Sequence, residues 1–519
     1  MNPLMREGAL LPAHLLIGAP VPADDAQAAR GGLDLRADAV VVGTGPGGAA
    51  AARAMAAAGM KVILLEEGPA YSRFRPNQAT AARYHMQEGG SMVAQGQGFM
   101  PIAAGRGVGG GTLVNSALSF RAPDEVLDEW ARLLQDQAFS AARMAPLFDE
   151  ISDRIGVRIA HAEIAGRNNQ LLVQGARALG LPAGLAPRST PGCQGCGMCN
   201  FGCPVGGKAS TNLTLLPDAW RDGARVQAET RVVEVLVEGG RAVGVRGIAS
   251  DPDSGAEVGE VRVRADKVVL SAGAVGTPRL LWHQGIAAAL GPVGEGMHVH
   301  PGNAVLGEND QEIRLWEGAT QGAFFTDPEL PGVLPHAFTA PPEATLVALG
   351  MVGADLAAGL DLLPRLSGAV VLVSDKGNGR VRATAEGRAA LRYDFLDEDL
   401  QRTKAGMVRT AEALLAAGAR RIKGLVHGTG WYEDAASFKA ALSGRGVTDF
   451  TLYAAHPMSS CRMGLDPSTS VVGPDAQAHG LPGLYIIDAS VFPTSLGVNP
   501  QLTIMTLATL LGRRLAGLG

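Results

Sequence analysis

Several features are scarce in this chain, and each scarcity argues against a class of function. Aromatic residues make up only 5% of the 519 residues, so a platform that stacks sugar rings is not favoured. The sequence has no run of Lys and Arg, its formal net charge is -5 and its pI is near 6.1. This balance argues against binding of nucleic acid.

Long apolar runs are also missing. The most apolar internal stretch, Thr345 to Leu363, carries Asp355 and Asp361 together with glycines, and is too polar to span a bilayer. We therefore expect no transmembrane segment, and we expect this stretch to form part of the core or a wall of a substrate cavity.

The N-terminal region does not match an export signal. Gly8 to Ala19 is mildly apolar, but Pro12 and His14 interrupt it and only Arg6 precedes it. We interpret residues 1–35 as an N-terminal arm and expect a cytoplasmic location.

A nucleotide-binding fingerprint follows this arm. The β-branched run Val40 to Val42 leads into GTGPGG, an Ala-rich stretch from Ala49 to Ala58 predicts a helix, and a second apolar strand, Lys61 to Leu65, ends at Glu66. The glycines in the G-x-G-x-x-G spacing are Gly43, Gly45 and Gly48. The pattern predicts a dinucleotide site, in which backbone amides approach a pyrophosphate at a helix N-terminus and Glu66 accepts hydrogen bonds from a ribose hydroxyl.

The C-terminal region contains residues suited to handling an alcohol. HPMSSCRMG places His456 near turns rich in Gly, Ser and Pro, and GVNPQLT supplies Asn499. A neutral imidazole can take a hydroxyl proton near working pH, while a carboxamide can hold the substrate oxygen without titrating. Pro500 suits the first turn of a helix through Gln501 and Thr503, whose positive end would face negative charge on a reduced cofactor.

Further glycine-rich segments complete a family resemblance. They are GRGVGGGTLVN from Gly105, SAGAVGTPRLL from Ser271 and VGEGMHVHP around His300. With the fingerprint and the His456 and Asn499 segments, the chain resembles the glucose-methanol-choline (GMC) oxidoreductases, FAD-dependent enzymes that oxidise alcohols. The resemblance covers most of both ends and leaves about 305–450 unmatched. We interpret His300 as structural and Cys461 as a packed thiol.

The resemblance implies a fold and a domain organisation. It implies an α/β protein in which a Rossmann-type FAD-binding domain, from residues 36–120, 205–300 and 455–519, is intertwined with an α+β substrate-binding domain. That second domain would comprise residues 121–204 and 301–454, and would contain the cysteine-rich segment 193–203.

The resemblance also implies site residues. His456 would accept the hydroxyl proton while hydride passes from the carbinol carbon to flavin N5. Relatives that link the flavin covalently use a His where this chain has Val114, so FAD is expected to be non-covalent. The implied cofactor-binding residues, beyond the fingerprint and the start of the last helix, are Gly109, Gly110, Thr112, Asn115 and Asp488.

The segment PGCQGCGMCNFGCPVGGK leaves alternatives open. Cys193, Cys196, Cys199 and Cys203 have the C-x2-C-x2-C-x3-C-P order in which ferredoxins bind iron–sulfur clusters. An iron–sulfur cluster, reduced structural thiols and, less in keeping with the spacing, a zinc site are the three interpretations. Disulfides are not expected without an export signal.

The expected function is FAD-dependent oxidation of a lipophilic primary or secondary alcohol to an aldehyde or ketone. A sugar or polyol dehydrogenase of the same family is the alternative, and a flavin or iron–sulfur electron carrier or redox sensor is the alternative from another class. A dehydrogenase passing electrons to a quinone or an electron-transfer protein is slightly favoured over an oxidase using oxygen.

Overall fold

A parallel βαβ unit stands at the centre of the first sheet. The structure is a computed structural model that describes residues 22–518 except 72–73, 75–76 and 352, so the Gly8 to Ala19 segment lies outside the described residues. Strand β1 (Leu33–Val42), helix α1 (Pro46–Ala57) and strand β2 (Val62–Leu65) form the unit. The two predicted strands and the predicted helix are confirmed, and α1 begins earlier than expected because Pro46 occupies its first turn after the N-cap Gly45.

This first sheet joins segments that are far apart in the sequence. Its order is β8-β2-β1-β11-β10-β9, with β20 paired to β11. The strands β8, β2, β1, β11 and β20 run parallel, whereas β9 and β10 form an antiparallel extension. The added strands are β8 (Arg225–Gln227), β9 (Thr230–Glu238), β10 (Arg241–Ser250), β11 (Glu257–Leu270) and β20 (Leu484–Ile486).

Helices cover this sheet and extend its core. Helix α1 packs against α13 (Gln501–Leu515) and α7 (Leu215–Arg221), and buries an almost entirely Ala and Gly surface. Small side chains permit this close packing of helix and sheet. Part of the stretch assigned to an arm also belongs here, because β1 begins at Leu33 and the side chains of Ala26 and Ala29 are buried in the same core.

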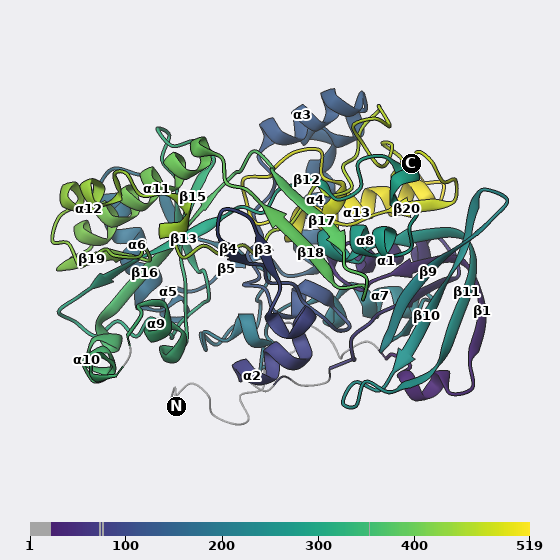
Figure 1. Cartoon of the computed structure of the whole chain (residues 1–519), viewed down its shortest axis with the longest axis horizontal. Helices are drawn as coiled ribbons and strands as arrows, with labels where there is room; N and C mark the ends of the chain where they lie inside the picture. The colour runs from purple at the N-terminus through teal and green to yellow at the C-terminus, as the bar shows by residue number, and fades with distance from the viewer. Residues whose placement is uncertain (1–21, 72–73, 75–76, 352, 519) are drawn as a thin grey trace.

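A second, antiparallel sheet forms the other half of the molecule. Its order is β19-β13-β16-β15-β14-β6, and α11 (Asp397–Ala416) packs against β13 and β16. Figure 1 shows this half, with α11 and α12 (Ala435–Leu442) on its outer side, opposite the half that contains β1 and β9 to β11. The strands are β6 (Ala183–Leu185), β13 (Gly302–Glu308), β14 (Ala323–Phe325), β15 (Val333–Ala337), β16 (Leu366–Val373) and β19 (Arg421–Gly424).

A third sheet lies between the two halves in Figure 1. Its order is β12-β17-β18-β3-β4, so it combines strands from the predicted FAD-binding domain with strands from the predicted substrate-binding domain. They are β3 (Val93–Gln95), β4 (Phe99–Pro101), β12 (Glu295–Met297), β17 (Gly379–Ala383) and β18 (Ala389–Tyr393); β5 (Arg158–Ile159) pairs separately with β7 (Pro187–Arg188). The α/β architecture with a Rossmann-type unit and an intertwined second half confirms the predicted fold class.

The remaining helices are α2 (Gln78–Thr80), α3 (Asp124–Leu134), α4 (Ala141–Arg154), α5 (Ala162–Ala165), α6 (Arg167–Ala178), α8 (Gly273–His283), α9 (Pro342–Ala348) and α10 (Ala354–Leu362). No helix in the described part of the chain has both the length and the apolar character needed to cross a bilayer.

Candidate functional site

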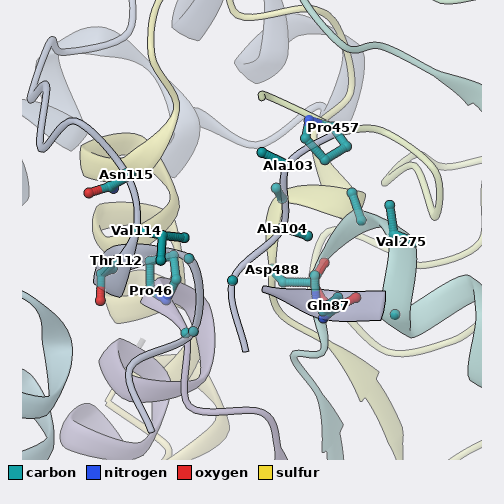
Figure 2. A pocket seen from close by; sticks show the side chains of 18 of the residues that line it. Pro46, Gln87, Ala103, Ala104, Thr112, Val114, Asn115, Val275, Pro457 and Asp488 are labelled. Carbon is teal, nitrogen blue, oxygen red and sulfur yellow. Dashed lines mark hydrogen bonds between the residues drawn. The ribbon is translucent and has the colours of Figure 1, made fainter. Parts of the chain in front are cut away.

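A cavity of about 570 Å³ brings together segments from both ends of the chain. Its volume lies in the range typical of cofactor and small-molecule sites. Figure 2 shows Thr112, Val114 and Asn115 on one side of it and Ala103 and Val275 on the other. The predicted site residues that line the cavity are Gly43, Gly45, Glu66, Gly110, Thr112, Asn115, His456, Asp488, Asn499, Pro500 and Gln501; Gly48, Gly109 and Thr503 do not line it.

The fingerprint turn places the start of α1 at the cavity wall. Gly43 has a φ of +104°, and a Cβ there would come within 2.4 Å of the Ser271 carbonyl oxygen, so only glycine fits. Gly48 faces the turn rather than the cavity, since a Cβ on it would meet the Gly43 carbonyl oxygen at 2.0 Å. The turn therefore leaves the first amides of α1 close to the cavity, the arrangement that binds a phosphate group.

Glu66 holds the loops around this turn together. Its carboxylate accepts hydrogen bonds from Thr44 N at 3.1 Å, Thr44 Oγ1 at 2.7 Å, Gly68 N at 3.1 Å and Gly107 N at 3.2 Å. Burial raises the pKa of Glu66 above its usual value, while the donors from Thr44 and Gly68 oppose that rise. Glu66 thus connects the end of β2 to two loops of the cavity wall.

The loop from Gly105 to Asn115 connects the fingerprint to the C-terminal helix. Gly109 N donates to Thr44 Oγ1 at 3.0 Å, and the Asn115 side chain donates to Gln501 Oε1 at the first residue of α13. Val114 lines the cavity with an aliphatic side chain that cannot form the bond that a His makes to a covalent flavin.

Asp488 closes the cavity near the end of the parallel strands. Its carboxylate accepts hydrogen bonds from Gly273 N at 2.9 Å, Thr277 Oγ1 at 2.7 Å and Ser490 N at 2.8 Å. Burial raises the pKa of Asp488, against these donors, which lower it. The hydrogen bonds from α8 and from its own turn therefore fix the position of the Asp488 carboxylate, the group predicted to contact a flavin.

His456 and Asn499 meet at the cavity wall. Asn499 Nδ2 lies 3.1 Å from His456 Nε2, and because an amide nitrogen only donates, this contact leaves the Nε2 lone pair as the acceptor. The ring proton of neutral His456 then lies on Nδ1, 3.3 Å from Nδ1 of His300. His300 Nε2 lies 3.1 Å from Ser495 Oγ, which can donate or accept, and 3.1 Å from Gly497 N, which can only donate.

A cluster of neutral histidines surrounds this pair. Burial, followed by the nearby imidazoles of His300 and His336, holds the pKa of His456 well below its usual value. Burial lowers the pKa of His300 to about 4 and that of His336 to about 3. His456 is therefore an uncharged imidazole at working pH, which is the form a general base requires.

The sequence gives no sign that His300 and His336 lie near His456. The interpretation of His300 as structural stays a prediction; its Nδ1 lies 3.3 Å from Nδ1 of His456, and His336 lies in a segment without a recognised motif. The available signal is the second histidine of VGEGMHVHP, His300, which is 156 residues away from His456 in the sequence.

Buried polar atoms without partners face this region. Among the described side chains, Asn499 Oδ1 and the Tyr453 hydroxyl are buried without a hydrogen-bond partner, and both residues line the cavity. A buried polar group that lacks a partner is costly unless a ligand or water supplies one. Together with the glycine turn at the start of α1 and the acid at the end of β2, these atoms fit a dinucleotide and a polar substrate group.

The predicted wall from the middle of the chain is largely absent. Of the described residues within 305–450, only Gln321 and Leu372 line the cavity. The apolar stretch 345–363 buries Leu346 and other leucines in a small cluster of its own, whereas Val347 is 79% exposed. Of the two alternatives for this stretch, core or cavity wall, the core is confirmed, because its leucines are buried in that cluster and none of its described residues lines the cavity.

The cysteine-rich segment lies beside the cavity. Its four sulfur-bearing side chains line one small separate cavity, and all five cysteines of the chain are unbridged. Within the described residues, no three His, Cys, Asp or Glu side chains are placed to hold one metal ion. Cys461, predicted to be a packed thiol, is fully buried away from this segment. The four residues of the small cavity are Cys193, Cys196, Cys199 and Cys203.

Comparison with family models gives a consistent result. Models described as GMC oxidoreductase match residues 82–302 and 373–508, and a model described as an FAD binding domain matches residues 38–95. An uncharacterised GMC-type oxidoreductase of Mycobacterium tuberculosis is 34% identical over 477 residues, which cover 91% of this chain and 75% of that protein. Long-chain-alcohol oxidase FAO4A of Arabidopsis thaliana is 30% identical over 514 residues, 92% of this chain and 68% of that protein.

Solved structures share the fold. Pyridoxine 4-oxidase from Mesorbium loti superposes with a TM-score of 0.71 at 17% identity, covering 92% of this chain and 98% of that one. Formate oxidase from Aspergillus oryzae gives 0.68 at 15% identity, covering 93% and 98%. At these identities the likeness shows a common architecture.

Proposed function

Because this chain belongs to the GMC oxidoreductase family, whose models and an FAD-binding model match most of it, we propose that it oxidises an alcohol with FAD as cofactor. One observation carries the proposal. Asn499 Nδ2 and the acceptor nitrogen of His456 lie 3.1 Å apart on the wall of the same cavity that the fingerprint residues Gly43 and Gly45 line.

The residues that would hold FAD, without a covalent link, lie around this cavity. When bound, FAD supplies a hydride acceptor for the carbinol carbon. The start of α1 would bind the pyrophosphate, and the start of α13, with Pro500 as its N-cap, would place its positive end near the negative charge that collects on the cofactor. The other proposed cofactor residues are Gly43, Gly45, Gly48, Glu66, Gly109, Gly110, Thr112, Asn115, Asp488, Gln501 and Thr503.

His456 and Asn499 would carry the proton side of the reaction. In the resting site His456 Nε2 is unprotonated and accepts from Asn499; the alcohol hydroxyl would replace Asn499 at this nitrogen and give its proton to it. Asn499 donates to the substrate oxygen through Nδ2 and does not titrate. The alcohol thus loses a hydride and a proton and becomes an aldehyde or ketone.

A lipophilic primary or secondary alcohol is the proposed substrate. Support comes from apolar side chains on the cavity wall, among them Ile102, Val275 and Leu372, and from relatives named long-chain-alcohol oxidase. A sugar or polyol would need several polar partners along such a wall.

The electron acceptor is proposed from the sequence of the cysteine-rich segment. We favour a dehydrogenase that passes electrons to a quinone or an electron-transfer protein over an oxidase, because the spacing of the four cysteines resembles that of one-electron carriers. The relatives named as oxidases support oxygen as the alternative acceptor.

A panel of alcohols under anaerobic conditions tests the proposal. Bleaching of the bound flavin by medium- and long-chain alcohols, with weak or no bleaching by polyols and sugars, is the expected result. Preference for polyols would move the assignment to a sugar or polyol dehydrogenase. Failure of every alcohol to bleach the flavin would favour an electron carrier or redox sensor without alcohol turnover.

A further inference from the structure

A buried carboxylate, that of Asp375, lies behind the proposed base. Asp375 follows the end of β16 and is 2% exposed. Its carboxylate accepts hydrogen bonds from Val299 N at 3.2 Å, His300 N at 3.1 Å and the Tyr393 hydroxyl at 2.8 Å. Among the ion pairs of the described residues, its partner is the imidazole of His298, whose Nδ1 lies 3.7 Å away, rather than an Arg or a Lys. The negative charge of Asp375 is therefore directed at the histidine segment.

Asp375 is ionised at working pH. Burial acts against ionisation, but the imidazoles of His298 and His300 and the phenol hydroxyl that it binds hold the pKa of Asp375 below its usual value. The influence is mutual, because burial lowers the pKa of His300 to about 4 while Asp375 opposes that fall. The carboxylate thus favours positive charge on the imidazole that contacts His456.

The backbone of His300 is held in a conformation that side chains rarely adopt. Its φ is +50°, in the left-handed region that glycine and asparagine tolerate best. Such a conformation persists only where the surroundings hold it, and it is common at functional sites. Asp375 Oδ1 binds the amide of His300, while Ser495 and Gly497 lie 3.1 Å from its ring nitrogen Nε2. Backbone and ring are therefore both fixed relative to His456.

The contacts of the two rings determine their tautomers. Asn499 Nδ2 only donates, so His456 Nε2 accepts and the ring proton of His456 lies on Nδ1. Nδ1 of His300, at 3.3 Å, must then be the acceptor for that proton. The proton of His300 consequently lies on Nε2, where Ser495 Oγ can accept it. Without an acceptor at Nδ1, His456 could carry its proton on Nε2, and that tautomer cannot take a proton from an alcohol.

The protonated base also needs stabilisation. Burial, then the imidazoles of His300 and His336, disfavour a positive charge on His456 and lower its pKa. A hydrogen bond whose donor becomes charged is strengthened, so the contact from His456 Nδ1 to His300 gains strength once Nε2 is protonated. The carboxylate of Asp375 stands directly behind this contact. A carboxylate behind an imidazole holds the tautomer and stabilises the imidazolium in the same way in hydrolytic triads.

We propose that His300 and Asp375 are positioning residues for His456. His300 accepts a hydrogen bond from His456 Nδ1 and so keeps Nε2 free for the alcohol, and Asp375 holds His300 in place and supplies the charge that stabilises the protonated pair. The hydroxyl proton of the alcohol passes to Nε2, the Nδ1 proton remains on His456 in its hydrogen bond, and no bond of His300 or Asp375 is broken. The stabilising role rests on the proposed function, whereas the tautomer does not.

The tautomer of His456 is measured first, by ¹⁵N NMR of FAD-loaded protein with labelled histidine. The signals of His456 are identified by their loss in His456→Gln. His300→Asn tolerates the left-handed backbone and puts Oδ1 in the place of Nδ1, whereas His300→Leu offers no acceptor. The proton should lie on Nδ1 of His456 in the unmodified protein and in His300→Asn, and should move at least in part to Nε2 in His300→Leu. A proton on Nε2 in the unmodified protein, or an unchanged tautomer in His300→Leu, would overturn the proposal.

Removal of the charge on Asp375 is the second test, and it does not depend on the folding of His300→Leu. Asp375→Asn keeps the shape and an acceptor for the amide of His300. The limiting rate of flavin reduction by an alcohol, measured without oxygen, should fall about 3- to 30-fold at an unchanged dissociation constant of the alcohol. Asp327→Asn, at a buried Asp that pairs with Arg409, is the control and should keep the normal rate.

Two outcomes would refute the role of the charge. Equal rates in Asp375→Asn and Asp327→Asn would show that the charge has no effect on the base. A raised dissociation constant of the alcohol, or a loss of FAD, without a lower limiting rate would show that Asp375 only supports the fold. If no alcohol reduces the flavin of the unmodified protein, the proposed function fails, and the tautomer measurement still decides whether His300 positions His456.

Discussion

Replacement of the proposed base is the most direct test of the catalytic site. In His456→Ala, the ring whose Nε2 lies 3.1 Å from Asn499 Nδ2 is removed, while the contacts of the fingerprint loops with Glu66 are kept. No neighbour can replace it. Asn499 does not titrate, and His300 and His336 do not line the cavity in which the alcohol would bind.

The expected loss is therefore the full contribution of a general base. This is about 10²- to 10⁴-fold in the rate of flavin reduction, or about 2.7 to 5.5 kcal/mol in the activation barrier. The assay is anaerobic stopped-flow mixing of FAD-loaded enzyme with a saturating alcohol, with FAD content measured beforehand. His161→Ala, at an exposed histidine, is the control and should reduce its flavin at the normal rate.

One result would refute the reasoning. If FAD-loaded His456→Ala reduced its flavin within about threefold of the unmodified enzyme, the barrier would have changed by less than about 1 kcal/mol. His456 would then be a neighbour of the reacting groups rather than the base, and the base would have to be sought elsewhere on the cavity wall.

Two further predictions concern cofactor retention and acid stability. Glu66→Gln removes a carboxylate oxygen that accepts from the loops of Thr44, Gly68 and Gly107, so the affinity for FAD should fall at least about tenfold. The flavin-to-protein ratio after dialysis measures this loss, and an unchanged ratio would contradict the role of Glu66. In the folded protein the pKa values of His300 and His336 lie below the value of 6.5 expected in the unfolded chain. Below pH 6.5 the unfolded chain therefore binds more protons, and the folded state loses stability as the pH falls. The free energy of unfolding, measured with denaturant, should be lower at pH 5 than at pH 8 by about 2 kcal/mol for each of the two histidines. His336→Gln should reduce this difference by about 2 kcal/mol, and an unchanged difference would show that His336 is not its source.

Local motifs made much of this site predictable. The run from Val40 to Glu66 encodes a strand, a turn, a helix and a strand within one continuous stretch, and hydrophobic period and glycine spacing are properties of such stretches. The motifs around His456 and Asn499 were recognisable for the same reason, and the structure brings their side chains together at 3.1 Å.

The sequence left open where its most apolar internal stretch would lie. The stretch 345–363 is apolar in composition, but whether such residues face a cavity, a core or solvent depends on what packs against them, and Val347 faces solvent. Composition carries no direction, so the lean towards a lipophilic substrate now rests on the side chains that line the cavity and on the named relatives.

The sequence by itself determined the nucleotide fold and the identities of the proposed catalytic pair, because both are written in short segments whose spacing limits the backbone. Only the tertiary structure placed His300 and His336 around His456, and set Asp375 against the backbone of His300. These contacts join residues on separate strands and loops, and their effect on charge arises from burial, which exists only once the chain has folded.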